Sequence, residues 1–129
     1  MPLVTTRRLA GVVVLASVGL AATGVQAQQQ PSGRDVYLHA CADCHQADGA
    51  GEPGEYPPLV HDPLVTGAST LGARIVLEGA GPMPNFDQQL TDAQIAAVLT
   101  YVRSSFGNNA GPVSPAVVAG ARNALAHGH

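Results

Sequence analysis

The chain has 129 residues, of which 46% are hydrophobic and only 4% aromatic, and it contains no Trp. Charged residues make up 12%, less than globular domains usually carry, there is no Lys, and the formal net charge is −3. These values exclude a charged coiled coil and a basic nucleic-acid-binding protein, and they leave one small domain with few large side chains for its core.

The first 27 residues have the pattern of a secretory signal peptide. Arg7 and Arg8 form a short basic region, residues 9–25 are uncharged and largely apolar, and residues 25–27 (Val-Gln-Ala) place small side chains at the expected cleavage site. Since a membrane span needs about 20 apolar residues, an uncleaved anchor is the weaker alternative. We therefore predict export to the periplasm, and removal of the two Arg would change the net charge from −3 to −5.

A helix is expected to begin after Ser32. Ser32 is a favourable N-cap, and Asp35 places a carboxylate in the first turn, where it suits the helix dipole. The helix is expected to run through Ala40 into the two cysteines of the chain, Cys41 and Cys44.

Residues 41–45 read Cys-Ala-Asp-Cys-His, the attachment motif of c-type haem. Cys41 and Cys44 are spaced to add to the two vinyl groups of one haem, and His45 follows as a ligand of the iron. A thioredoxin-type redox pair would need a βαβ pattern around the motif, and a structural zinc site would need a second pair of ligands. Neither is visible, so we predict one covalently bound haem c.

An extended loop is expected over residues 46–66, which contain four Pro and three Gly without a sustained period. The run that includes Asp43, Asp48, Glu52 and Glu55 has no Arg or Lys. This acidic stretch could steer a basic redox partner, or it could simply be a solvated loop.

A second helix is expected over residues 70–78, ended by Gly79. The following loop contains Met83 between two prolines, and Met83 is the only methionine outside the predicted signal peptide. A thioether is a soft, neutral ligand that favours ferrous iron. We therefore predict that His45 and Met83 are the two axial ligands, the alternative being a Met that merely packs in a turn.

The clearest predicted helix starts at Thr91, which forms a capping box with Gln94, and runs to Val102 before Gly107. Ser114 and Pro115 could start a further short helix packed on the outside of the domain, or this alanine-rich tail could be loosely ordered. We divide the chain into a signal peptide (1–27), a monohaem domain (28–109) and a C-terminal extension (110–129).

Taken in order, these motifs resemble the class I c-type cytochromes, in particular the small bacterial monohaem subunits and domains that accompany periplasmic dehydrogenases and oxidases. The resemblance covers residues 33–106. It rests on residues 41–45, on Tyr-Pro-Pro-Leu at 56–59, on Gly-Pro-Met-Pro at 81–84 and on Leu-Thr-Asp at 90–92 leading into a helix that ends in Tyr-Val-Arg at 101–103. It implies an all-α cytochrome c fold, with three to five helices around one covalently attached haem.

The resemblance also implies individual roles. Gly33 and Tyr101 would lie where the first and last helices of the domain cross, and the carbonyl of Pro57 or Pro58 would accept a hydrogen bond from the axial His45. The implied function is electron transfer, without an enzymatic activity of its own, between a dehydrogenase donor and an oxidase or reductase acceptor. Membrane contact would come only through partners or an uncleaved leader. A tethered relay subunit of a larger complex and a ligand-binding haem sensor or enzyme are the alternatives.

Overall fold

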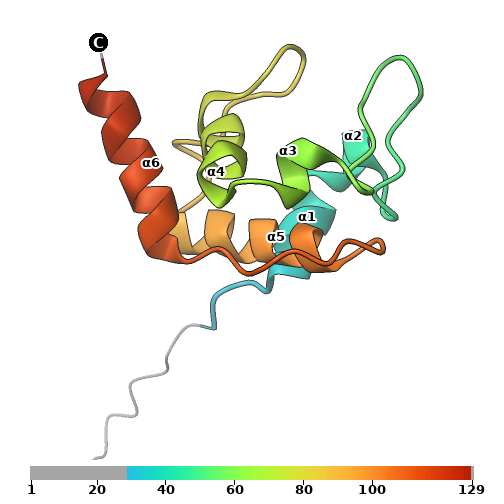
Figure 1. The fold of residues 1–129 in the computed structure, drawn as a ribbon, viewed down its shortest axis with the longest axis horizontal. Helices are drawn as coiled ribbons and strands as arrows, with labels where there is room; N and C mark the ends of the chain where they lie inside the picture. Colours follow the sequence, from blue (N-terminus) through green and yellow to red (C-terminus); the bar gives the residue numbers. More distant parts are fainter. Residues whose placement is uncertain (1–28, 129) are drawn as a thin grey trace, which may run out of the picture.

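The computed structural model describes residues 29–128, and its regular elements are all helices (Figure 1). They are α1 (Gly33–Ala40), α2 (Ala42–His45), α3 (Pro63–Thr66), α4 (Ser69–Glu78), α5 (Asp92–Ser104) and α6 (Pro115–His127). Four of them are eight residues or longer, and the described part of the chain has two isolated β-bridges but no strand. The predicted all-α fold is confirmed, whereas the predicted signal peptide lies outside the described residues.

The helix starts follow the sequence. Ser32 and Thr91 each accept a hydrogen bond at 3.2 Å from the backbone N–H three residues on, and both form complete capping boxes. Ser114 caps α6, with Pro115 as its first residue. The hydrogen bonds from Ser32 lower the pKa of the Asp35 carboxyl, so this cap stabilises the fold above the ordinary pKa of Asp and is lost as the pH falls through the lowered value.

The crossing of α1 over α5 depends on Gly33. A Cβ at this position would lie 2.1 Å from the Ala97 carbonyl oxygen and 2.9 Å from Tyr101 Cβ, so any side chain would force the helices apart. Beneath the crossing, Tyr37 is fully buried and its ring lies 5.5 Å from that of Tyr101 and 5.3 Å from that of Phe106. The predicted crossing at Gly33 and Tyr101 is therefore confirmed.

Helix α6 packs against both α4 and α5, and Figure 1 shows it standing at one edge of the molecule beside α4. Val118 has no exposed surface, and Ala121 is buried one turn further along the same face. Together with Val113 they share one core cluster with Ala73, Leu77, Ile95 and Ala96. The C-terminal helix thus supplies part of the interior.

Two predicted boundaries were wrong. The first helix ends at Ala40, Cys41 takes a non-helical conformation, and the short α2 follows. The expected loop over 46–66 contains α3, because Asp62 accepts a hydrogen bond from the Leu64 N–H at 2.6 Å and Pro63 fits the first helical position. Among residues 29–128, no helix is both long enough and apolar enough to cross a membrane.

Candidate functional site

A cavity of about 380 Å³ lies between the helices and two loops, one over residues 46–62 and the other over residues 79–90. We call these loops the Pro57 loop and the Met83 loop. The volume is within the range of about 300–1,000 Å³ that is usual for ligand and cofactor sites. Most lining residues are apolar: Leu59, Leu64, Val65, Ile75, Val76, Phe86, Val98, Leu99 and Val102. Cys41, Cys44, His45, Pro57 and Met83 line the same cavity, whereas Pro58 does not.

The two cysteines carry free thiols at the junction of α1 and α2. Both are partly buried, and burial, with a smaller contribution from Cys44, raises the pKa of the Cys41 thiol to about 11. This thiol is therefore protonated at neutral pH. The short α2 carries Cys44 and His45, and both line the same cavity as Cys41.

The orientation of His45 is fixed by the Pro57 loop. Its Nδ1 donates a hydrogen bond to the carbonyl oxygen of Pro57 at 3.0 Å, which leaves Nε2 as the ring atom with a free lone pair. The loop returns close to α2, because the Gly51 N–H donates to the His45 carbonyl at 3.0 Å. The hydroxyl of Tyr37 donates to the Gln46 carbonyl at 2.6 Å and anchors the start of the loop.

The far end of the Pro57 loop is anchored by Asn108, which the sequence did not single out. Asn108 is only 6% exposed. Its Nδ2 donates to the carbonyls of Leu59 at 2.8 Å and Val102 at 2.9 Å, and its Oδ1 accepts from the His61 N–H at 2.7 Å. One side chain thus joins the loop to the end of α5.

Met83 enters the cavity wall from the Met83 loop. Gly79 ends α4 with a φ of 76°, and Ala80 and Met83 exchange two backbone hydrogen bonds of 3.0 and 3.1 Å that close a tight turn. The Phe86 N–H then donates to the Val76 carbonyl at 3.0 Å, which returns the chain to α4. The Met83 side chain is half-buried, and it reaches the cavity from a different segment than His45 does.

Arg103 was noted in the sequence only as part of the Tyr-Val-Arg motif, and its anchoring role was not predicted. It is 8% exposed, and its Nε donates to the Gly111 carbonyl at 2.7 Å. Its Nη1 donates to the carbonyls of Val65 at 2.7 Å and Gly67 at 2.8 Å. It thus fastens the end of α3 to α5. A run of backbone carbonyls has no pattern in the sequence, so neither Asn108 nor Arg103 could be recognised there.

The residues of the cavity fit a haem. The wall is apolar, as a porphyrin requires, two thiols stand at its edge for covalent attachment, and an imidazole and a thioether provide donors for iron. The competing interpretations of the cysteine motif fit less well. Residues 29–128 contain no strand for a thioredoxin-type βαβ unit and no group of three or more His, Cys, Asp or Glu that could hold a metal ion.

An all-helical fold around an apolar cavity bordered by this set of side chains defines the class of c-type cytochrome domains. The family model described as cytochrome c oxidase, cbb3-type, subunit III matches residues 28–102. Because this match covers more than half of the chain, the protein belongs to this family of c-type cytochromes, a family of electron carriers that implies haem c.

Curated relatives agree with this assignment. The chain is 38% identical over 94 residues to the cytochrome c subunit of the quinone-dependent alcohol dehydrogenase of Gluconobacter oxydans, and the match covers 64% of this chain and 20% of the relative. It is 35% identical over 94 residues to the cytochrome c subunit of the gluconate 2-dehydrogenase of Pantoea cypripedii, and this match covers 61% of this chain and 21% of the relative. A cytochrome c-552 of Thermus thermophilus is 33% identical over 101 residues, and this match covers 66% of this chain and 67% of the relative. The chain thus spans about a fifth of the length of the dehydrogenase subunits that it matches.

Proposed function

We propose that this protein is a periplasmic electron carrier that holds one haem c through Cys41 and Cys44, with His45 and Met83 as its axial ligands. The observation that carries the proposal is the cavity itself, because both cysteines, His45 and Met83 line one apolar space although they come from separate segments. The haem iron supplies the one-electron chemistry by alternating between the ferric and ferrous states.

The side chains around the cavity have separate tasks. The carbonyl of Pro57 holds His45 in one ring orientation, which is the outer-sphere role expected for a metal-ligating imidazole. Met83 supplies a neutral donor that favours the reduced state. The apolar walls exclude water, and a dry site favours the form of the cofactor with the lower net charge.

The location and partners belong to the same proposal. The predicted signal peptide over 1–27 supports export to the periplasm, where the N-terminus of the mature protein would be Gln28. Relatives that are cytochrome subunits of dehydrogenases favour a dehydrogenase as the electron donor. They equally favour a second arrangement, in which this domain is a tethered relay within a larger complex. Purification under mild conditions separates the two: a monomeric elution profile supports the free carrier, and co-elution with a dehydrogenase supports the relay.

Absorption spectra of the purified protein in both redox states, with and without carbon monoxide, test the ligand set. A ferrous haem that already has two protein ligands binds carbon monoxide poorly, because Met83 must first leave. We expect a low-spin spectrum in both states and little reaction with carbon monoxide at neutral pH. Rapid stoichiometric binding would contradict the carrier and favour a ligand-binding haem protein.

A further inference from the structure

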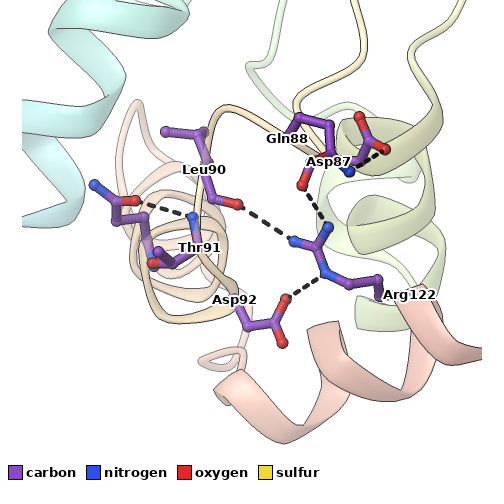
Figure 2. Close-up of polar contacts among 7 residues, drawn as sticks. Asp87, Gln88, Leu90, Thr91, Asp92 and Arg122 are labelled. Atoms are coloured by element: carbon purple, nitrogen blue, oxygen red, sulfur yellow. Dashed lines mark hydrogen bonds and ion pairs between the residues drawn. The ribbon is translucent and has the colours of Figure 1, made fainter.

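Arg122 of the C-terminal helix makes polar contacts with the Met83 loop (Figure 2). Its Nη1 donates to the Asp87 carbonyl at 2.5 Å, and its Nη2 to the Leu90 carbonyl at 3.3 Å. Its Nε forms an ion pair with the Asp92 carboxylate at 2.8 Å, next to the start of α5. We propose that Arg122 is a positioning residue that holds the Met83 loop in place, so that α6 controls how readily Met83 moves away from the cavity. This inference rests on the proposed function of Met83 as a ligand.

The carbonyls that Arg122 contacts, at residues 87 and 90, lie four and seven residues after Met83. Phe86 is 7% exposed and lines the cavity, and its N–H is bonded to the carbonyl of Val76 on α4. Its own carbonyl accepts hydrogen bonds from the N–H groups of Gln89 and Leu90 at 3.1 and 3.0 Å, which closes residues 86–90 into a compact turn. Arg122 holds the carbonyls at positions 87 and 90 of this turn. Phe86 thus connects the turn that Arg122 holds to Met83, three residues earlier in the same loop.

The helix that carries Arg122 is itself well fixed. Val118 and Ala121, which lie four residues and one residue before Arg122, are buried against α4 and α5. Arg122 is 31% exposed and Asp92 32%, so the ion pair is only partly open to solvent. The guanidinium is planar and presents several N–H donors in fixed directions, so a Lys could keep the charge but could not reach both carbonyls and the carboxylate together.

The test compares Arg122→Gln, Arg122→Lys and Asp92→Asn in the haem-loaded protein, with imidazole as the probe. Imidazole binds ferric iron only after Met83 has moved away, so its dissociation constant reports how firmly the loop is held. We expect Arg122→Gln to bind imidazole about tenfold more tightly, since hydrogen bonds that involve a charged group are lost, and Arg122→Lys about threefold. Asp92→Asn keeps the two bonds to carbonyls and is expected to change the affinity by about twofold or less.

Arg74→Gln is the matched control, because Arg74 also pairs with a carboxylate, Glu78 at 3.3 Å, but lies on the exposed side of α4. It is expected to leave imidazole affinity unchanged. The far-red absorption band of Met-ligated ferric haem is recorded for each variant, and it is expected to weaken in Arg122→Gln and to be restored in part in Arg122→Lys. Urea unfolding gives the global stability of each variant.

Two outcomes would overturn the proposal. One is an Arg122→Gln protein that loses stability but keeps the imidazole affinity and far-red band of the unchanged protein, which would make Arg122 a purely structural residue. The other is an Arg74→Gln protein that matches Arg122→Gln. If Arg122→Gln does not fold, the comparison of Arg122→Lys with Arg74→Gln decides in the same way. A far-red band absent from the unchanged protein would instead refute Met83 ligation, so the two proposals fail separately.

Discussion

The Pro57 loop and the Met83 loop border the same cavity, but they are fastened by different chemistry. The Pro57 loop is held by neutral groups, the Tyr37 hydroxyl at its start and the buried amide of Asn108 at its end. The Met83 loop returns to α4 through a backbone hydrogen bond at Phe86. Further along, its carbonyls at residues 87 and 90 accept hydrogen bonds from the guanidinium of Arg122. The side chains that hold the Pro57 loop, Tyr37 and Asn108, are buried, whereas Arg122 and Asp92 beside the Met83 loop are 31% and 32% exposed. We therefore expect a substitution of Arg122 to affect the Met83 loop and to leave the Pro57 loop in place.

The largest expected effect is on the Pro57 loop. In Asn108→Leu, three backbone groups lose their hydrogen-bond partner, one at a buried and two at partly buried positions, and a fully buried group left without a partner costs about 1–3 kcal/mol. Since the loop can relax in part, we expect the free energy of unfolding of the haem-loaded protein to fall by about 3 kcal/mol in urea titrations. The neighbouring Asn109 is exposed, so Asn109→Leu is the matched control, with little expected change. An Asn108→Leu protein as stable as this control would contradict the role of Asn108.

Met83→His would give the Met83 loop an imidazole, the same side-chain group that His45 provides from α2. An imidazole stabilises ferric iron better than a thioether does, so we expect the reduction potential to fall by more than about 0.1 V, within the roughly 0.8 V range that axial ligands span. Potentiometric titration followed by absorbance measures this change. A potential equal to that of the unchanged protein would show that Met83 is not a ligand.

Substitutions at two glycines of the Met83 loop distinguish the effect of backbone strain from the effect of displacing Met83. Gly79 and Gly81 have φ values of 76° and 56°, so Ala at either position costs about 1–3 kcal/mol of stability. A Cβ at Gly79 would lie 2.6 Å from the Met83 carbonyl oxygen and 2.9 Å from Asn85 N, whereas a Cβ at Gly81 meets nothing within 4 Å. We expect Gly79→Ala to bind imidazole about fivefold more tightly as well, because the backbone that carries Met83 must shift.

Gly81→Ala is then the control for Gly79→Ala, because it shares the strain but not the collision. Its imidazole affinity is expected to equal that of the unchanged protein. Equal affinities for the two variants would show that strain alone loosens the loop.

The smallest expected effect concerns surface charge. Glu55 in the Pro57 loop is exposed and lines the mouth of the cavity, whereas Glu78 carries the same charge on α4 outside the lining. With a cationic ruthenium ammine as reductant, we expect Glu55→Gln to slow electron transfer about twofold at low salt and Glu78→Gln to change it less. Rates that do not depend on ionic strength for the unchanged protein would contradict steering by the acidic stretch.

Local features were predictable from the sequence, and distant ones were not. The caps at Ser32, Thr91 and Ser114 and the stop at Gly79 depend on neighbours within a few residues, and all four were recognised. The residues that could hold a haem were recognised because the cysteine motif and a single Met are chemically distinctive. The choice between Pro57 and Pro58 stayed open, since it depends on which carbonyl faces His45 across a folded loop.

The anchoring roles of Asn108 and Arg122 were not predicted from the sequence, because their partners are backbone carbonyls of residues far away in the chain. Asn108 reaches the Leu59 carbonyl across 49 residues, and Arg122 reaches the Asp87 carbonyl across 35. Any residue type can supply a carbonyl, so the partner side of such a contact has no composition or period to detect. The short α3 was missed for a different reason, because its Asp-Pro start at residues 62–63 is a weak pattern inside a proline-rich stretch.

Arg103 has a consequence that goes beyond its contacts. The guanidinium of Arg103 is a cation, and the hydrogen bonds that this buried side chain makes within residues 29–128 end on neutral carbonyls. One of these carbonyls belongs to Val65, whose side chain lines the cavity. A positive potential therefore extends through the low-dielectric interior toward the place where an electron would be stored. For a haem held as proposed, this charge would stabilise the reduced form by Coulomb attraction and so raise its reduction potential.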